Sequence, residues 1–148
     1  MKKDVLILLV IVGAFALIQS INSVGIGTGN KVGPLLIQTT EDTFQEKLTA
    51  SGDWVLLDFW APWCPNCLRY KPAINQVAAS LKDSLKVLAV NVDDAPGIAN
   101  QFNVSGIPVV VLLYRGREID RRIGGMPAVV LEDWITSTQQ TIQPVAYD

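Results

Sequence analysis

The fold is decided by the stretch from Val55 to Pro72, which reads VLLDFWAPWCPNCLRYKP. Its first part, together with the preceding Trp54, forms an almost unbroken apolar run from 54 to 60, a pattern typical of a strand covered on both faces. Its second part carries apolar residues at helical spacing, which predicts a long helix that opens at Cys64 or its neighbour and kinks at Pro72. Cys64 and Cys67 therefore lie at a strand-to-helix junction.

The sequence on either side predicts further alternating strands and helices. Strands are expected at 35–38, 54–60, 85–92, 109–113 and 118–123, and helices around 44–48, from 64 to 81, from 93 to 102 and from Pro127 onward. The inner face of the last helix is expected to hold Val130, Leu131, Trp134 and Ile135. This order predicts an α/β fold with a central mixed sheet of four to five strands and helices on both faces.

Composition excludes several classes of function. The chain has 148 residues, enough for one domain, and a net charge of −2 without a long basic block, so no nucleic-acid partner is expected. It contains no histidine, which removes imidazole acid-base chemistry and histidine-bound zinc. Its two cysteines are only three residues apart and cannot form a disulfide framework across the fold.

The first residues predict export from the cytoplasm. Lys2 and Lys3 precede an apolar run from Val5 to Ile18, which is shorter than the roughly 20 residues of a full membrane span and fits a secretory signal. With the two lysines held inside, the remainder of the chain faces outward, in the periplasm or an equivalent compartment. Membrane contact is expected only through this segment.

These observations divide the chain into three parts. We expect residues 1–20 to be a signal peptide or an N-terminal membrane anchor, 21–33 a flexible linker rich in Gly, Ser, Asn and Thr, and 34–142 the folded domain. The sequence leaves two outcomes open for residues 1–20. The segment could be removed by cleavage after a small residue such as Gly25, or it could be retained as a tilted membrane anchor.

The cysteine pair has a physical logic of its own. At a helix start, backbone N–H groups and the helix dipole stabilise a thiolate, which makes Cys64 the expected nucleophile. Cys67 follows one turn later and can attack a mixed disulfide to release the partner. Pro65 fits the first helical position, which needs no N–H.

Two other interpretations of the pair stay open. The cysteines could be inert, although Pro62, Trp63 and Pro65 are expected to build a turn that presents the first sulfur. They could also be half of a zinc site, but zinc would need two further ligands from a second subunit or from carboxylates.

Asp58 is a carboxyl residue inside the apolar run that precedes the cysteines. If it is buried, desolvation raises its pKa, and it could accept a proton from Cys67. The alternative is that the alternation of a strand points it outward into solvent. The residues alone leave both orientations open.

Four ordered motifs resemble the thioredoxin family. The stretch from Val55 to Pro72 resembles the active-site strand and helix, Val87 to Asp93 the central strand, Ser105-Gly106-Ile107-Pro108 the cis-proline loop, and Gly124 the glycine after the last strand. The likeness covers roughly residues 35 to 139 and implies a thioredoxin-like fold for 34–142.

The resemblance also implies roles for individual residues. It implies that Cys64 is the attacking thiolate and Cys67 the resolving thiol of a redox disulfide, with Asp58 as a buried proton relay and Trp63 as a lid beside the sulfurs. It implies further that Pro108 is cis and faces the disulfide, and that Ile107 offers backbone groups to a bound peptide. No cofactor beyond the cysteine pair is expected.

Two departures from the family pattern concern the redox chemistry. Pro65-Asn66 replaces the usual Gly-Pro between the cysteines, which leaves the reduction potential open. Ala89 stands where many thioredoxins place a lysine beside the buried acid, so Asp58 is expected to lack a cationic partner and to have its pKa governed by desolvation.

The expected function is thiol-disulfide exchange on exported proteins, in the direction of a protein-disulfide reductase fed by a membrane-embedded thiol donor. The alternatives are a disulfide oxidase or isomerase of the same fold, and a non-catalytic binding or chaperone module. Four arginines near the last two strands, at 115, 117, 121 and 122, are expected to be edge-strand charges or a docking patch for an acidic partner.

Overall fold

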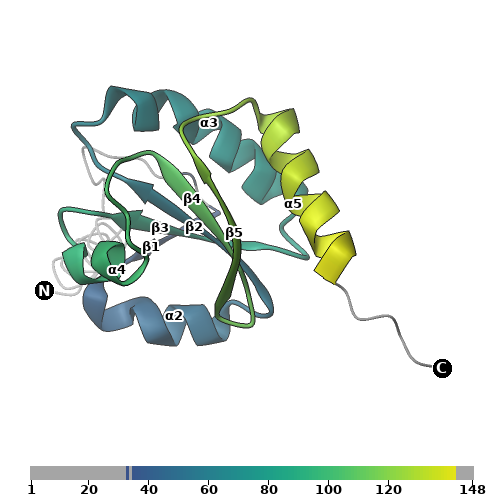
Figure 1. The fold of residues 1–148 in the computed structure, drawn as a ribbon, viewed down its shortest axis with the longest axis horizontal. Helices are drawn as coiled ribbons and strands as arrows, with labels where there is room; N and C mark the ends of the chain where they lie inside the picture. Colours follow the sequence, from purple (N-terminus) through teal and green to yellow (C-terminus); the bar gives the residue numbers. More distant parts are fainter. Residues whose placement is uncertain (1–32, 34, 143–148) are drawn as a thin grey trace, which may run out of the picture. The chain divides into compact units, whose positions relative to one another are not determined.

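The computed structural model describes residue 33 and residues 35–142 of the chain (Figure 1). Apart from residue 33, the predicted export segment and linker lie outside this part. Within it, no helix combines the length and the apolar character that crossing a bilayer requires.

Five strands and five helical segments follow each other in the predicted order. The strands are β1 (Leu36–Thr39), β2 (Trp54–Trp60), β3 (Lys86–Asn91), β4 (Val109–Tyr114) and β5 (Arg117–Ile123). The helical segments are the short 3-10 helix η1 (Glu41–Thr43), α2 (Phe44–Ala50), α3 (Pro65–Ser80), α4 (Pro96–Gln101) and α5 (Ala128–Ile142). The α/β fold and its mixed sheet are thereby confirmed.

The strands form one sheet in the order β1-β3-β2-β4-β5. β1, β3 and β2 run parallel, whereas β4 is antiparallel to both β2 and β5. All seven residues of the central strand β2 are buried, since helices cover both faces of the sheet. Figure 1 shows α3 and α5 on one face and α2 with α4 on the other.

Alternate residues of β2 belong to two different cores. Leu56 and Trp60 pack with the residues of α3 and α5, whereas Leu57 and Phe59 pack with those of α2 and α4. Because side chains alternate along a strand, Asp58 lies on the face that α3 covers. The sequence of β2 therefore places a carboxyl residue between the sheet and the helix that carries both cysteines.

The inner face of α5 differs from its prediction at one residue. Leu131, Trp134 and Ile135 are buried, but Val130 is 50% exposed. The buried stripe of a helix follows spacings of three and four residues, and it continues here to Gln139. Val130 lies next to that stripe and is turned toward solvent, so its assignment to the inner face is wrong.

This face of α5 gives a stability prediction. Replacing Leu131 by alanine is expected to lower the free energy of unfolding by about 3 kcal/mol, because it leaves a cavity in the core beneath α5. The neighbouring change Val130→Ala is expected to stay within about 0.5 kcal/mol, because that side chain is half exposed. Urea unfolding of the two variants measures both values. Equal losses of unfolding free energy in the two variants would contradict the assignment of Leu131 to the buried face of α5 and of Val130 to its exposed side.

Three of the four arginines near the sheet edge have acidic partners. Arg115 pairs with Asp53 at 3.3 Å, Arg121 with Glu118 at 2.6 Å, and Arg122 with Asp120 at 3.0 Å. β5 is an edge strand, and charges on such a strand discourage pairing with other sheets. The local pairing favours this interpretation over a docking patch for an acidic partner.

Candidate active site

Cys64 and Cys67 form a disulfide at the start of α3, with an S–S distance of 2.10 Å. Cys64 is the N-cap residue, and its sulfur accepts a hydrogen bond from the Cys67 N–H at 3.1 Å. Pro65 occupies the first turn, as predicted, where its missing N–H costs nothing. This geometry supplies a donor to the sulfur of Cys64 and would favour its thiolate after reduction.

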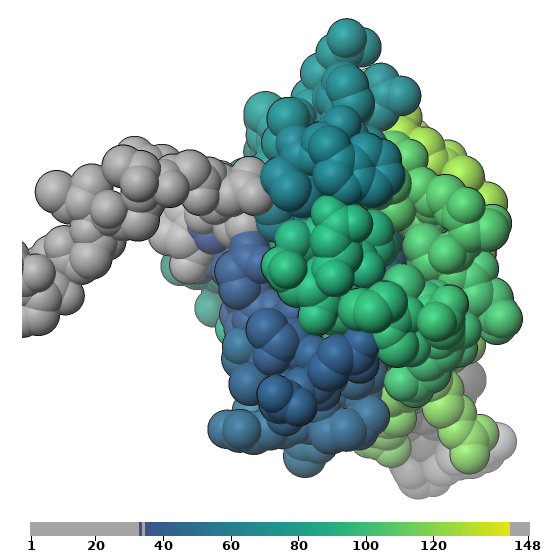
Figure 2. Space-filling model, turned by 90° about the vertical axis from the view of Figure 1, so that its left-hand side faces the viewer, coloured from purple at the N-terminus to yellow at the C-terminus, as the bar shows by residue number. Residues whose placement is uncertain are grey.

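The disulfide is less accessible than the predicted turn suggests. Cys64 is 5% exposed and Cys67 3% exposed, so little of either sulfur reaches the surface. The part of the chain described by the structure holds no group of three or more cysteine, aspartate or glutamate side chains able to bind a metal ion. Figure 2 shows the surface at this end of the molecule, where the teal first turns of α3 stand beside the green region of α4.

Trp63, directly before the pair, is 64% exposed. Its indole N–H donates to the carboxylate of Asp93 at 2.7 Å. Trp63 follows β2 and Asp93 follows β3, and the carboxyl ends of these parallel strands lie at the same edge of the sheet. The resemblance placed Trp63 beside the sulfurs, but Asp93 was taken only as the end of the central strand and the start of a helix, so the residue that holds the indole was missed.

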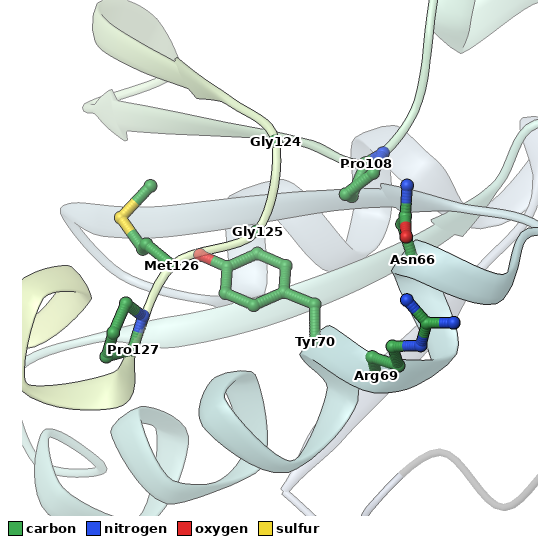
Figure 3. Close-up of a pocket in the computed structure, with 8 residues that line it drawn as sticks. All are labelled: Asn66, Arg69, Tyr70, Pro108, Gly124, Gly125, Met126 and Pro127. Carbon is green, nitrogen blue, oxygen red and sulfur yellow. The ribbon is translucent and has the colours of Figure 1, made fainter.

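The peptide bond between Ile107 and Pro108 is cis, as the resemblance implied. Pro108 is buried directly before β4, and Ile107 is partly buried. Figure 3 shows the Pro108 ring facing Asn66, one of the two residues between the cysteines. The predicted proline loop thus lies against the turn that carries the disulfide.

A groove of about 440 Å³ runs from this contact along α3. It is lined by Asn66, Arg69, Tyr70, Pro108, Gly124, Gly125, Met126 and Pro127. The Tyr70 ring extends from α3 toward the segment after β5, where Gly124 adopts a positive φ of 86° (Figure 3). Neither Tyr70 nor Arg69 was identified as a site residue from the sequence. Arg69 and Tyr70 follow Asn66 by three and four residues, which places the three side chains on one helix face. This spacing was the signal available in the sequence.

Asp58 is 3% exposed, which shows that the outward orientation is wrong. Its partners in the sheet are Ala89 on β3 and Val110 on β4, neither of which carries a polar side chain. Burial raises the pKa of Asp58 from 3.8 to about 7, and the positive charge of Lys71 opposes this rise. A carboxyl group of this pKa can take up and release a proton near neutral pH.

Lys71 corrects the expectation that Asp58 lacks a cationic partner. It lies on α3, is 9% exposed, and holds its ammonium 3.3 Å from the centroid of the Trp60 ring. Burial lowers the pKa of Lys71, while the charge of Asp58 raises it. The cation comes from the helix rather than from the neighbouring strand. Lys71 follows Cys67 by four residues, which places both side chains on one helix face. This spacing was the signal available in the sequence.

Comparison with known proteins agrees with this geometry. The thioredoxin family model matches residues 35–137. Thioredoxin 1 of Synechococcus elongatus is 35% identical over 92 residues, which are 62% of this chain and 86% of that protein. The thioredoxin of Griffithsia pacifica is 37% identical over 94 residues, 64% of this chain and 86% of that protein.

The fold is also similar to solved structures. A thioredoxin variant from Halobacterium salinarum superposes with a TM-score of 0.64 at 26% identity, covering 74% of this chain and 96% of the other. Residues 35–137, which the family model matches, contain the disulfide, the cis-proline loop and the buried acid. The chain therefore belongs to the thioredoxin family, as a thiol-disulfide oxidoreductase with Cys64 and Cys67 as its redox pair.

Proposed function

We propose that the chain is a protein-disulfide reductase that acts outside the cytoplasm. The observation that carries the catalytic part is the buried Asp58, with a pKa of about 7, on the face of the sheet that the cysteine-bearing helix α3 covers. A carboxylate in this place favours loss of the Cys67 proton, which is the step that completes the reduction of a substrate. Trp63, Ile107 and Pro108 are the residues proposed to hold the substrate peptide.

The first step forms a mixed disulfide. The Cys64 thiolate attacks one sulfur of a substrate disulfide, a bond forms between Cys64 and that sulfur, and the other substrate sulfur leaves and takes up a proton. The groove beside Pro108 gives an extended peptide a place next to the disulfide.

The second step releases the reduced substrate. The Asp58 carboxylate takes the proton of Cys67, and the resulting thiolate attacks the sulfur of Cys64. The disulfide between the cysteines forms, and the second substrate sulfur leaves as a thiolate that takes up a proton. Two electrons have then passed from the two cysteines to the substrate.

Export is supported by the amino-terminal sequence, where Lys2 and Lys3 precede the apolar run from Val5 to Ile18. An enzyme outside the cytoplasm is out of reach of cytoplasmic reductants, so a membrane-embedded thiol protein is proposed as its electron donor. Protease accessibility of the full chain in intact spheroplasts tests this location. A Leu9→Arg variant, which interrupts the apolar run, is the control and is expected to stay protected.

Substrates are expected to be captured by the full chain with Cys67 replaced by serine. This variant can form the mixed disulfide but cannot resolve it, so exported proteins should accumulate in covalent complexes that dithiothreitol releases. The Cys64→Ser variant is the matched control and should capture none. Absence of exported proteins among the complexes would contradict the proposal.

The direction of electron flow is tested by the reduction potential of the Cys64–Cys67 pair. One observation favours a disulfide oxidase or isomerase instead, namely the replacement of the usual dipeptide by Pro65-Asn66. Equilibration with glutathione should give a value near that of thioredoxin, about −270 mV, for a reductase. A value near about −120 mV, typical of a strong periplasmic oxidant, would reverse the assignment.

A further inference from the structure

The groove beside Pro108 is lined by side chains that can donate hydrogen bonds and by no acidic side chain. Its eight lining residues include Asn66, Arg69 and Tyr70 from α3, and none of the eight is an aspartate or a glutamate. Figure 3 shows the Arg69 side chain extending from α3 toward Asn66, whose amide faces Pro108. A group that enters this groove therefore meets a positive charge close to the turn that carries the disulfide.

The charge of Arg69 is not neutralised within the part of the chain that the structure describes. Arg69 is exposed, and it forms neither an ion pair nor a side-chain hydrogen bond with any residue of that part. Arg115, Arg121 and Arg122, by contrast, each have an acidic partner. A guanidinium presents its N–H groups as a planar fork that fits the two oxygens of a carboxylate. The free charge of Arg69 is therefore suited to a carboxylate from a bound molecule.

Tyr70 brings a second unused donor to the groove. Its side chain is 4% exposed, and its hydroxyl is buried without a hydrogen-bond partner among the described residues. The ring is held under the segment after β5, where a Cβ added to Gly125 would lie 3.4 Å from the Tyr70 Cγ atom. Burial raises the pKa of Tyr70 and the charge of Asp58 raises it further, so the phenol keeps its proton at neutral pH. Because a buried hydroxyl without an acceptor is costly, an acceptor oxygen entering the groove would be favoured.

The helix sets the position of Arg69 relative to the reacting sulfur. Arg69 follows Cys64 by five residues, which corresponds to about 7.5 Å along the helix axis. An extended peptide advances about 3.3 Å per residue, so this length equals about two residues of a bound substrate. The partial positive charge at the start of α3 also favours an anion there. A substrate cysteine held against Cys64 thus brings residues one or two positions away to Arg69.

We propose that Arg69 determines substrate specificity: it selects disulfides that have an aspartate or a glutamate within two residues of the reactive cysteine, with the Tyr70 hydroxyl as a second donor to that carboxylate. The inference rests on the exchange reaction given under Proposed function and names the substrate class of that reaction. It predicts that the mixed disulfide forms faster with acidic peptides, because the guanidinium holds the carboxylate while Cys64 attacks.

The test uses the full chain with Cys67 replaced by serine, so that only the attack by Cys64 is measured. The probes are short peptides, acetylated and amidated at their ends, whose single cysteine carries a 2-pyridyl disulfide. The Cys64 thiolate attacks the peptide sulfur, the bond to the pyridyl sulfur breaks, and the leaving thiolate takes up a proton to give 2-thiopyridone, whose absorbance reports the rate.

Each peptide has glutamate, glutamine or lysine at one position within two residues of its cysteine. At the best position the glutamate peptide should react about fivefold faster than the glutamine peptide, the size of effect of a good ion pair at a partly exposed site. High salt should remove this preference. Each ratio compares two peptides on the same protein, so a general effect of a substitution on Cys64 cancels.

Substitutions in the same protein assign the preference to the groove. Arg69→Gln should lower the glutamate preference to less than about twofold, and Arg69→Glu should reverse it in favour of the lysine peptide. Tyr70→Phe keeps the ring and removes only the hydroxyl, so it should lower the ratio about twofold. Lys82→Gln removes a positive charge from an exposed lysine just after α3, and as the matched control it should keep the fivefold ratio.

Equal rates for glutamate and glutamine at every position would overturn the inference, as would a preference that survives in both Arg69 variants. A glutamine peptide that ends in a free carboxylate next to its cysteine tests the other source of this group, and a preference for that peptide alone would also overturn the acidic side chain. An unchanged ratio in Tyr70→Phe would overturn the part assigned to its hydroxyl. Failure of every peptide to react would overturn the proposed exchange reaction itself, whereas equal reaction with all of them would overturn only the selection by charge.

Discussion

Replacing Cys64 by serine is expected to reduce disulfide exchange more than about 10³-fold, to the background of the assay. The reaction begins with attack by a thiolate, and a serine hydroxyl stays protonated at neutral pH and does not displace sulfur from a disulfide. Serine is also a favourable N-cap residue, so its oxygen can replace the sulfur as acceptor for the Cys67 N–H. The variant should therefore keep α3 while losing its chemistry.

The Cys67→Ser variant is the matched control for stability. Both variants lose the disulfide, whose short loop contributes at most about 2 kcal/mol through chain entropy, so both should unfold at similar urea concentrations. Only Cys67→Ser should still form one mixed disulfide per molecule with a model protein disulfide. Thiol release and non-reducing electrophoresis measure the two steps.

The same pair of variants tests the binding or chaperone alternative. A module whose cysteines are incidental should suppress the aggregation of an unfolded protein equally well with serine at 64. Loss of exchange without loss of folding would exclude inert cysteines. Undiminished exchange by the Cys64→Ser variant would contradict its assignment as the nucleophile.

The strands were predictable because their signals are local. β2 and β4 are runs of apolar residues, and a sheet covered on both faces needs such runs wherever it is central. The junction of β2 with α3 was also predictable, because Pro65 fits the first turn and Cys67 begins the helical periodicity. These two features locate the disulfide without any knowledge of tertiary contacts.

The orientation of Asp58 could not be predicted from alternation. Alternation tells which residues share a face of a strand. In a sheet that helices cover on both sides, however, neither face of a central strand is exposed to solvent. Both orientations of Asp58 would have been buried, as the apolar run from 54 to 60 indicated and the order β3-β2-β4 confirms. The solvent-exposed alternative was therefore wrong because it assumed that one face of β2 is exposed to solvent. The alternation of side chains along the strand was applied correctly.

The cation was missed because it depends on the packing of a helix against a sheet. Ala89, on the neighbouring strand, stands where the family pattern has a lysine, and this substitution suggested that Asp58 has no cationic partner. Lys71 reaches this core from α3, and a lysine on a helix is usually solvated. The contact between Trp63 and Asp93 was missed for a similar reason, since these residues are 30 positions apart. Both pairs follow from tertiary structure, which local patterns do not encode.

Replacing Asp58 by asparagine is expected to slow the resolving step about 100-fold at pH 7, a size typical for removal of a general base. Asparagine has nearly the same shape but cannot accept the Cys67 proton. The rise of the rate through the pKa of Asp58, near pH 7, should disappear as well. Single-turnover measurement of mixed-disulfide decay between pH 5 and pH 9 separates this step from the attack by Cys64, which should change little.

The same substitution is expected to make the protein more stable at high pH. The pKa of Asp58 is 3.8 in a solvated reference state and about 7 in the folded protein. Between these values the unfolded chain has already lost the proton that the folded protein keeps, so the stability of the native protein falls as pH rises through this window. A shift of about three units corresponds to about 4 kcal/mol as an upper limit.

Asparagine removes this pH dependence because it never ionises. Urea unfolding at pH 4 should therefore give similar free energies for the two proteins, whereas at pH 8 the Asp58→Asn variant should be more stable by up to about 4 kcal/mol. A residue kept at this cost in stability, and needed for the resolving step, has the signature of an active-site group. Equal stability at pH 8 would show that the carboxylate is solvated or fully paired, and it would remove the basis for its pKa near 7.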